Sequence, residues 1–297
     1  MVIVQLIGGL GNQMFQYAAG RALALHHRTA LKLDISAFAS YPLRTYRLHH
    51  LRIHEDFATP QEVAAVQAGG CSHLARWIWK VRRRLGHVPY YAQPVYRERE
   101  RQAHVFDPHL VRARRDVYLI GYWQSEKYFA AIADLIREEF QLREEPSATS
   151  RELAQRIQDC QAVSLHVRRG DYVTNPRTHQ VHGVCSLEYY ARCIAYIAQR
   201  VEHPTFFVFS DDPDWARAHI RPGHPTVYVT HNGAARDYED LWLMSQCKHH
   251  ILANSSFSWW GAWLCRNPDK IVLAPQRWFN DLSIDTRDLL PEHWLRL

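Results

Sequence analysis

The sequence lacks the features that mark a secreted or membrane-spanning protein. No apolar run approaches the ~20 residues that a membrane-spanning helix needs. The chain opens directly on a strand-like run, residues 2–6, with no basic-then-apolar signal segment before it. Its six cysteines form no Cys-x-x-Cys pair and no Cys/His spacing suited to zinc. Most of them stand in apolar stretches, which favours free thiols in a reducing compartment. These absences predict a cytoplasmic protein.

No strong charge imbalance is present either. The 36 basic and 30 acidic residues give a net charge of +6, spread along the chain. A mild positive balance suits an anionic small molecule or an anionic membrane surface, but it is too diffuse for nucleic-acid binding, which needs a concentrated basic face. With 47% hydrophobic residues and a length of 297, the chain is expected to form two soluble globular domains.

The dinucleotide fingerprint Gly-x-Gly-x-x-Gly is also missing. A strand at residues 2–7 is followed by a glycine-rich turn at residues 8–13, a helix at 14–27 and a strand at 31–34, which is typical of the opening of a doubly wound α/β domain. The glycines are spaced Gly-Gly-x-Gly. Such a turn lets backbone amides approach a phosphate or sugar closely, and a tight strand–helix turn without a ligand is an equal alternative.

The middle of the chain, residues 35–116, carries few clear patterns. Residues 60–68 are expected to be helical, and residues 88–101, with clustered Tyr, Pro and Arg, are expected to be an irregular surface segment. Residues 74–85 form a basic amphipathic helix that either lies on the inner face of an anionic membrane or packs its apolar side in the core. The second reading is favoured, because core-facing amphipathic helices are commoner.

Residues 117–121 are predicted to be a strand and residues 126–140 a helix. The polar stretch 143–150 is the best candidate for a domain junction. We therefore predict an N-terminal α/β domain over residues 1–150, with an irregular insertion at about 40–115, and a C-terminal α/β domain over residues 151–297.

The stretch AVSLHVRRGDY at residues 162–172 is the most informative one. Its apolar start predicts a buried strand, and His166, Arg168, Arg169 and Asp171 follow at the strand's end. In open α/β sheets ligands bind at the carboxyl ends of the strands. Two adjacent guanidinium groups suit a diphosphate, because each donates paired charge-assisted hydrogen bonds. The alternative is an Arg–Asp turn on the surface.

After residue 172 strands and helices alternate regularly, which specifies a parallel sheet covered by helices. Two further strands end in polar clusters, Ser210-Asp211-Asp212 and Asn254-Ser255-Ser256. If the strands are parallel, these clusters and the arginines share one edge of the sheet. Ser255 and Ser256 also stand where a helix begins, which suits a phosphate. The convergence predicts a nucleotide-diphosphate site, in which a carboxylate takes a sugar hydroxyl or the donor edge of guanine.

The acidic string Asp211-Asp212-Pro213-Asp214 resembles a metal-binding sequence. Hydrogen bonding or helix capping is favoured instead, because adjacent carboxylates at a helix start are ordinary. We expect no metal site and no bound cofactor.

Four motifs occur in order along the chain: GGLGNQMFQYA at residues 8–18, HVRRGDY at 166–172, FSDD at 209–212 and NSSFSWWGAWL at 254–264. Together they resemble the α-1,2-fucosyltransferases of glycosyltransferase family 11. The resemblance implies a GT-B-like fold, with two Rossmann-type domains facing a central cleft. It also implies metal-independent, inverting transfer of L-fucose from GDP-L-fucose to O2 of a terminal β-galactoside. No motif covers residues 40–115, where acceptor choice is expected to be decided.

The resemblance also implies roles for single residues. Arg168 and Asp171 are the catalytic candidates: Arg168 is expected to hold the β-phosphate, and Asp171 to lie near the ribose or to hold Arg168. The other candidates for donor binding are Ser255, Ser256 and Phe257 at the phosphates, His166 and Asp240 near the guanine, and Gly11, Asn12 and Gln13 from the other domain. No residue stands out as the general base, for which Asp171 and Asp211 are nominal candidates.

Three alternatives remain open. The protein is a transferase that uses GDP-fucose with another acceptor or linkage, a module that binds nucleotide sugars without catalysis, or a protein that binds nucleic acid through Arg82–Arg84. The intact polar groups at all three strand ends favour an enzyme over a binding module.

Overall fold

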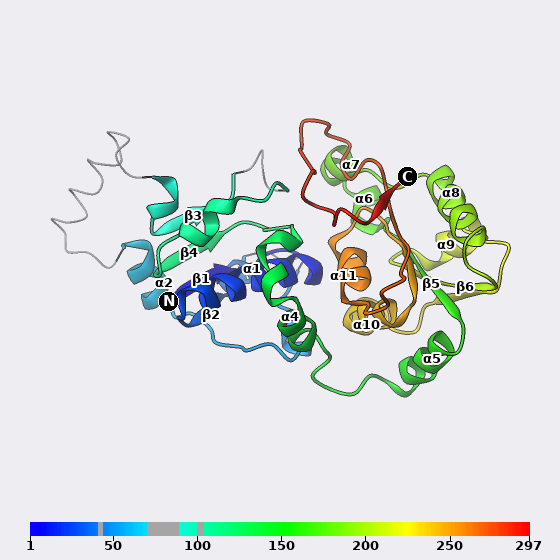
Figure 1. Ribbon diagram of the computed structural model, residues 1–297, viewed down its shortest axis with the longest axis horizontal. Coiled ribbons are helices and arrows are strands. Elements are labelled where there is room, and N and C mark those ends of the chain that lie inside the picture. The colour runs from blue at the N-terminus through cyan, green and yellow to red at the C-terminus, as the bar shows by residue number, and fades with distance from the viewer. Residues whose placement is uncertain (41–43, 70–88, 100–103) are drawn as a thin grey trace. The chain divides into compact units, whose positions relative to one another are not determined.

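The computed structural model describes residues 1–40, 44–69, 89–99 and 104–297. The basic helix expected at residues 74–85, with Arg82–Arg84, lies outside the described residues. The chain divides into two compact units (Figure 1). Unit 1 contains Met1–Phe140 and Asp285–Leu290, and unit 2 contains Gln141–Ile284 and Pro291–Leu297. The division after residue 140 lies just before the expected junction at 143–150 and ten residues before the predicted boundary, because Ser147 and Ser150 are bonded to Glu239 and His231 of unit 2.

Unit 1 is built on a parallel four-stranded sheet with the order β2-β1-β4-β3. The strands are β1 (Val2–Gln5), β2 (Leu31–Asp34), β3 (Val95–Arg97) and β4 (Val117–Ile120). The helices are α1 (Leu10–His27), α2 (Pro60–Gln67) and α4 (Ala133–Glu139), and short 3-10 turns include η3 (Tyr90–Ala92), η5 (Pro108–Arg112), η6 (Glu126–Tyr128) and η7 (Ala130–Ile132). Strand β1, at the start of the chain, lies inside the sheet and pairs in parallel with β2 and β4, as in a doubly wound domain.

The structure corrects three of the expected boundaries in unit 1. Helix α1 begins at Leu10 and not at residue 14, because the amides of Asn12 and Gln13 already donate to the Gly9 carbonyl. Within the segment 88–101, expected to be irregular, β3 pairs with β4. The helix expected over residues 126–140 is broken into two 3-10 turns and α4, because the fully buried Phe129 adopts φ −133°, outside the helical range, while packing against Phe15.

Unit 2 is built on a six-stranded parallel sheet with the order β10-β9-β8-β5-β6-β7. The strands are β5 (Gln161–Val167), β6 (Pro204–Ser210), β7 (Thr226–Val229), β8 (His249–Ile251), β9 (Val272–Ala274) and β10 (Leu295–Arg296). The helices are α5 (Ala148–Gln158), α6 (Gly170–Thr174), α7 (Pro176–His182), α8 (Leu187–Ala198), α9 (Pro213–His219), α10 (Asp237–Gln246) and α11 (Ser256–Leu264). The predicted alternation of strands and helices with a parallel sheet is confirmed.

Helices cover both faces of the central strand β5, so its side chains are buried on both sides. Val163, Leu165 and Val167 pack in a cluster with residues of α8 and α9. Ala162 packs in a second cluster with residues of α5 and α10. Because successive side chains of a strand point to opposite faces, His166 shares the face of Ala162. The strand thus delivers His166 to the side on which α5 and α10 pack.

Helices α10 and α11 pack closely against each other, as Figure 1 shows. A Cβ atom on Gly261 would lie 2.8 Å from the Met244 Cβ, so only glycine permits this approach. Trp259 and Trp260, on the same helix as Gly261, are fully buried. The aromatic run SFSWWGAWL therefore fixes α11 in the core and holds its N-terminus at the edge of the sheet.

The structure bears on the membrane-spanning helices and on the state of the cysteines. Among the described residues, no helix is both long and apolar enough to cross a bilayer. The described cysteines are free: Cys193, Cys247 and Cys265 are buried, and Cys160 and Cys185 are half-buried. The expectation of free thiols is confirmed for these five residues.

Candidate functional site

Three polar strand ends meet at one edge of the sheet of unit 2. Strand β5 pairs in parallel with β6 on one side and with β8 on the other. Arg168 follows β5, Asp211 follows β6, and Asn254 follows β8 after two intervening residues. The prediction that these three clusters share one edge is confirmed, and this edge is the candidate site.

The arginines at the end of β5 are held by the carboxylates at the end of β6. An Nη1 of Arg168 lies 3.0 Å from Oδ2 of Asp211. Nε of Arg169 lies 3.1 Å from Oδ2 of Asp212, and its guanidinium carbon lies 3.8 Å above the ring of Trp215. The guanidinium carbon of Arg168 lies 5.3 Å from the centroid of the Tyr172 ring, so both arginines combine an ion pair with an aromatic contact, and the contact of Arg169 is the closer one.

The carboxylates of Asp211 and Asp212, which follow β6, also bind backbone N–H groups. Oδ1 of Asp211 also accepts the backbone N–H of Arg169 at 2.8 Å, and Oδ1 of Asp212 accepts the N–H of Trp215, which caps α9. A Cβ atom on Gly170 would lie 2.4 Å from Oδ2 of Asp211, so the turn fits only glycine. The predicted hydrogen bonding and helix capping are confirmed. Within the described part of the chain, no three His, Cys, Asp or Glu side chains gather closely enough to hold a metal ion.

His166 is a neutral, buried imidazole at the end of β5. Burial and the nearby positive charge of Arg168 lower the pKa of His166 to about 3. Its side chain is buried beside the Phe257 ring, with 5.7 Å between the centroids. Nδ1 of His166 has no hydrogen-bond partner among the described residues. A buried polar nitrogen without a partner costs free energy, so this atom marks a place for a ligand or a water molecule.

The N-terminus of α11 lies at the end of β8. Ser255 caps the helix, and its side-chain oxygen accepts the backbone N–H of Phe257 at 3.3 Å. Ser256 and Phe257 form the first turn, where the helix dipole is positive and the amides favour an anion. The structure thus brings Ser255, Ser256 and Phe257 to the edge that holds Arg168 and His166.

Asp240 lies in the first turn of α10, and its carboxylate accepts a 2.7 Å hydrogen bond from Nδ2 of Asn232. Burial raises the pKa of Asp240 to about 7, with the neighbouring charges of Asp237 and Glu239 acting in the same direction. Asn232 follows the fourth strand end, that of β7, which pairs in parallel with β6. The sequence reasoning missed Asn232, although the rule that revealed the other strand ends applies to β7 as well.

Asn254, in contrast, is a structural residue. It is buried, and its Nδ2 donates to the carbonyls of His182, Gly183 and Trp278 at 2.9, 3.3 and 3.2 Å. The side chain therefore ties the end of β8 to the segment after α7 and to residue 278.

We expect Asn254→Ala to lower the free energy of unfolding by about 2 kcal/mol, because it leaves buried carbonyl groups without their donor. Urea unfolding of both proteins measures this loss. Asn267→Ala is the matched control, because the half-buried Asn267 donates to only one carbonyl, that of Lys248. Equal losses in the two variants would contradict the structural role of Asn254.

Two of the candidate residues of unit 1 shape the turn after β1. Gln13 is fully buried, its Nε2 donates to the carbonyls of Gly8 and Thr45, and its Oε1 accepts the N–H of Arg47. Oδ1 of Asn12 accepts a 2.8 Å hydrogen bond from Gln124. Gly11 follows Leu10 in the first turn of α1. The approach of these residues to a donor remains a prediction.

Asp171 is the second residue of α6, but its side chain lies outside the described part of the structure. The role expected of Asp171, near the ribose or holding Arg168, therefore stays a prediction, and the described ion-pair partner of Arg168 is Asp211. Asp211 is consequently engaged by two arginine groups, and its nominal role as general base is not supported by this geometry.

The sequence profile described as "Glycosyl transferase family 11" matches residues 83–296. The chain belongs to this family. The resemblance deduced from the four motifs is thereby confirmed, and the protein is a glycosyltransferase.

Relatives that match nearly the whole length of this chain support the assignment. The chain is 34% identical to the alpha-1,2-colitosyltransferase of Escherichia coli, with 100% of this chain and 99% of the relative covered. It is 32% identical to the O-antigen biosynthesis glycosyltransferase WbnK of Escherichia coli, with 98% and 99% covered. It is 29% identical to galactoside alpha-(1,2)-fucosyltransferase 1 of Saimiri boliviensis boliviensis, with 90% and 66% covered.

A solved structure is similar in fold. FUT1 of Arabidopsis thaliana, a mutant in complex with GDP, matches with a TM-score of 0.51 and 13% sequence identity over 99% of this chain and 75% of that one. At this identity the likeness concerns the fold alone. The predicted α/β, GT-B-like fold class is confirmed.

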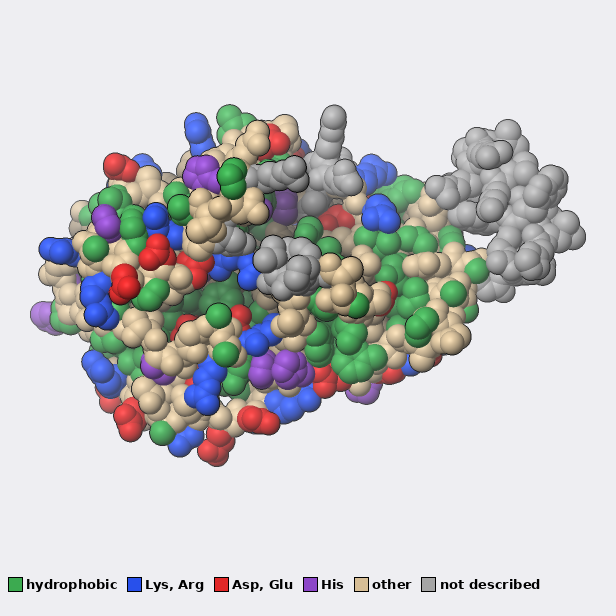
Figure 2. All heavy atoms as spheres, turned by 180° about the vertical axis from the view of Figure 1, so that it is seen from behind, with side chains coloured by type: hydrophobic (Ala, Val, Ile, Leu, Met, Phe, Trp, Pro, Cys, Tyr) green, Lys and Arg blue, Asp and Glu red, His purple; other side chains and the backbone are tan. Residues whose placement is uncertain are grey.

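The alternative of nucleic-acid binding through Arg82–Arg84 falls on residues outside the described part of the chain. On the face shown in Figure 2, acidic and basic side chains are interspersed where the structure is described. A nucleic-acid interface requires basic side chains concentrated on one face.

Proposed function

We propose that the family 11 enzyme transfers L-fucose from GDP-L-fucose to O2 of a terminal β-galactoside, with inversion and without a metal ion. The observation that carries the proposal is the shared edge of β8, β5 and β6, which combines an arginine pair with a helix N-terminus. Both groups favour the same ligand chemistry, a diphosphate. The names of two relatives, an alpha-1,2-colitosyltransferase and a galactoside alpha-(1,2)-fucosyltransferase, support the linkage.

In this proposal Arg168 binds the β-phosphate. Departure of GDP leaves negative charge on that phosphate, and a guanidinium fixed by Asp211 stabilises the charge without reorganising. The amides and hydroxyls at Ser255, Ser256 and Phe257 hold the remaining phosphate oxygens. A cationic side chain here takes the part that a divalent cation plays in other phosphate sites.

The guanine is proposed to lie near His166 and Asp240. The unpartnered Nδ1 of His166 and the carboxylate of Asp240 offer hydrogen-bonding groups suited to a base with both donors and acceptors. Asp171 is proposed to lie near the ribose, and Gly11, Asn12 and Gln13 are proposed to approach the donor from unit 1. The protein is further proposed to act in the cytoplasm, with peripheral contact at the inner face of the membrane as a separate hypothesis.

The deciding experiment is an assay of fucose transfer from GDP-L-fucose to a panel of β-galactosides in excess EDTA, with the linkage and anomer read by NMR. An α-1,2-fucoside formed in EDTA is expected. Transfer that requires added Mn²⁺ would contradict metal independence, and a product of another linkage or anomer would contradict the regiochemistry. No transfer under either condition would refute the proposed reaction.

A second candidate for the donor sugar is favoured by a specific observation. The 34% identity to an alpha-1,2-colitosyltransferase over the full chain makes a colitosyl donor the competing substrate. The two are separated by measuring kcat/KM with GDP-L-fucose and with nucleotide-activated colitose on the same acceptor. A higher value with the colitosyl donor would establish this second candidate.

A further inference from the structure

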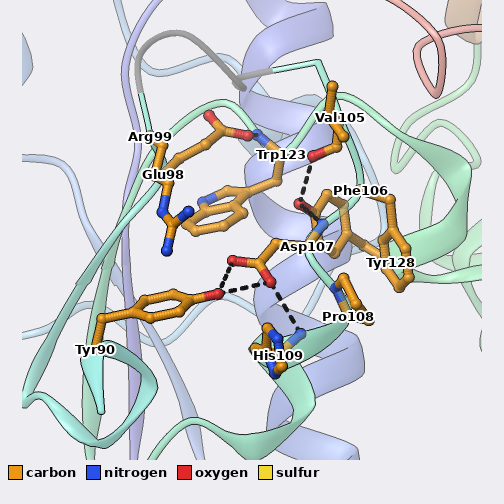
Figure 3. Close-up of a pocket in the computed structure, with 10 residues that line it drawn as sticks. All are labelled: Tyr90, Glu98, Arg99, Val105, Phe106, Asp107, Pro108, His109, Trp123 and Tyr128. Carbon is orange, nitrogen blue, oxygen red and sulfur yellow. Dashed lines mark hydrogen bonds between the residues drawn. The ribbon is translucent and has the colours of Figure 1, made fainter. Parts of the chain in front are cut away.

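Unit 1 contains a pocket of about 250 Å³ that the donor chemistry of unit 2 does not involve. Tyr90, Glu98, Asp107, Trp123 and Tyr128 are among the residues that line it (Figure 3). Glu98 follows β3, and Trp123 follows the adjacent strand β4. The pocket thus lies at the carboxyl ends of two parallel strands, where α/β sheets bind ligands.

Asp107 holds one side of the pocket rigid. It accepts hydrogen bonds from the hydroxyl of Tyr90, at 2.7 and 2.9 Å, and from the backbone N–H of His109 (Figure 3). It also accepts one from the hydroxyl of Tyr96, at 2.8 Å. Burial would raise the pKa of Asp107, but these hydrogen bonds lower it, so the carboxylate is ionised near neutral pH. Asp107 therefore places a negative charge in a lining that also contains the guanidinium of Arg99, and it fixes the orientation of the aromatic wall.

Glu98 supplies a second carboxyl group. Its oxygens accept the backbone N–H groups of Tyr122 and Trp123 at 2.6 and 3.0 Å. A Cβ atom on Gly121 would lie 2.4 Å from the Cβ of Glu98, so the end of β4 is shaped to fit this side chain. Burial raises the pKa of Glu98 to about 8, while the two amides act against this shift.

Trp123 carries the observation that points to a ligand. Its side chain is 0% exposed, and its indole Nε1 has no hydrogen-bond partner among the described residues. The rings of Tyr96 and Tyr128 pack on it, with centroids 5.9 and 5.6 Å away. Its φ of 56° is a backbone conformation rare for so bulky a residue. The fold therefore holds an unsatisfied donor in this pocket at a cost of roughly 1–3 kcal/mol.

The groups of the pocket select one class of ligand. The indole N–H needs an acceptor, and the two carboxyl groups have room for a further hydrogen bond beside those they already accept; a hydroxyl group can serve both. The raised pKa of Glu98 leaves its carboxyl group largely uncharged at neutral pH, and the charge of Asp107 is accompanied by that of Arg99, so the lining does not favour an ion of one sign. Aromatic rings favour contact with the apolar face of a ring. An uncharged sugar ring meets all of these requirements.

We propose that this pocket binds a pyranose ring of the glycan acceptor, with Nε1 of Trp123 donating to one of its hydroxyls and the carboxyl groups of Glu98 and Asp107 accepting from others. As an acceptor site, it rests on the proposed function. It assigns the choice of acceptor to the lining residues at 90–99 and 105–128, within and just after the region that no family motif covers.

The test compares Trp123→Phe with Trp294→Phe. Nε1 of Trp294 is likewise buried and unpartnered among the described residues, but Trp294 belongs to unit 2 and does not line the pocket. Trp123→Phe is expected to raise the KM for the β-galactoside about tenfold. The KM for GDP-fucose and the hydrolysis of GDP-fucose without acceptor should stay unchanged. Trp294→Phe should leave all three values unchanged.

A series of monodeoxy β-galactosides makes the test specific. For the wild-type protein, one analogue should lose about tenfold in kcat/KM, and Trp123→Phe should show no further loss with that analogue. An unchanged acceptor KM in Trp123→Phe, or equal losses with every analogue, would overturn the proposal. If Trp123→Phe fails to fold, Glu98→Gln, which keeps the size of the side chain, must show the same selective rise in acceptor KM.

Direct binding separates this proposal from the proposed reaction. Saturation-transfer NMR measures binding of methyl β-galactoside to the wild-type protein and to Trp123→Phe without any transfer step. If the protein does not transfer fucose from GDP-fucose, but Trp123→Phe weakens the binding of methyl β-galactoside, the pocket is supported and the proposed reaction is refuted. If the protein does transfer fucose, but Trp123→Phe leaves the binding of methyl β-galactoside unchanged, only the proposal for the pocket is refuted.

Discussion

Arg168→Lys is expected to lower kcat by about 10²–10³-fold while leaving the fold intact, which is the typical effect of removing one preorganised group from a developing negative charge. Lysine keeps the positive charge and the ion pair with Asp211, whose Oδ2 lies 3.0 Å from Nη1 of Arg168. It loses the planar fork that donates two parallel hydrogen bonds to a phosphate. The measurement is kcat at saturating donor and acceptor, together with the melting temperature.

Arg200→Lys is the matched control for this substitution. Arg200 is exposed on unit 2, where its guanidinium carbon lies 3.6 Å from the ring of Tyr196. Its replacement should change neither kcat nor the melting temperature. A kcat near that of the wild type in Arg168→Lys would refute the assignment of Arg168 to the β-phosphate, since the charge alone would then suffice.

The sheet edge of unit 2 could be predicted from the sequence because its signals are local. An apolar run followed at once by polar residues marks both a buried strand and its exposed end, and regular alternation with helices makes the strands parallel. The positions of Arg168, Asp211 and Ser255 at one edge follow from these two facts. The cap of α8 is local in the same way: Ser186 directly precedes the helix, and its side chain accepts the N–H of Tyr189.

The ion pairs at the same edge could not be predicted. Sequence spacing shows that carboxylates and guanidinium groups lie near each other, but the choice of partner depends on the register of β5 and β6, which pairs Val167 with Ser210. This register places Asp211 beside Arg168. Interactions across strands are set by tertiary structure, so local patterns do not fix them.

The pocket of unit 1 was missed for a different reason. Strand β3 has three residues, too few to show an alternating pattern, and the segment around it looked irregular. Nothing in the sequence reveals that Glu98 accepts the amides of Tyr122 and Trp123, because this contact joins two strands 24 residues apart. Such pockets depend on the positions of side chains after folding.

Asp240→Asn is expected to raise the Kd for GDP about 10–100-fold at pH 8, because a carboxylate that accepts hydrogen bonds from the guanine edge contributes more than a neutral amide. The Kd for ribose 5-phosphate should change little, since this ligand lacks the base. Calorimetric titration of both ligands with the wild-type and variant proteins measures the difference. Equal weakening of the two ligands would remove Asp240 from the base pocket.

The raised pKa of Asp240 adds a pH dependence whose sign can be derived. With a pKa of about 7 in the free protein, the carboxyl is mostly protonated at pH 6. Because binding the guanine edge requires the ionised form, the affinity for GDP should fall about tenfold between pH 8 and pH 6. Pyrophosphate, which titrates in the same range but lacks the base, is the control ligand. The Asp240→Asn protein should show only the change that pyrophosphate shows.

Stability without nucleotide should follow the opposite trend. A carboxyl whose pKa is higher in the folded protein than in the unfolded chain destabilises the fold when it is ionised, so the contribution of Asp240 improves as the pH falls from about 7 towards 4. Asp240→Asn should therefore melt at a higher temperature than the wild type at pH 8, and this gain should shrink at pH 5. A variant that melts lower at pH 8 would mean that the carboxylate stabilises the free protein. In that case the lower melting temperature would show that Asp240 serves the structure of α10. The weaker GDP binding of Asp240→Asn would then reflect a damaged fold.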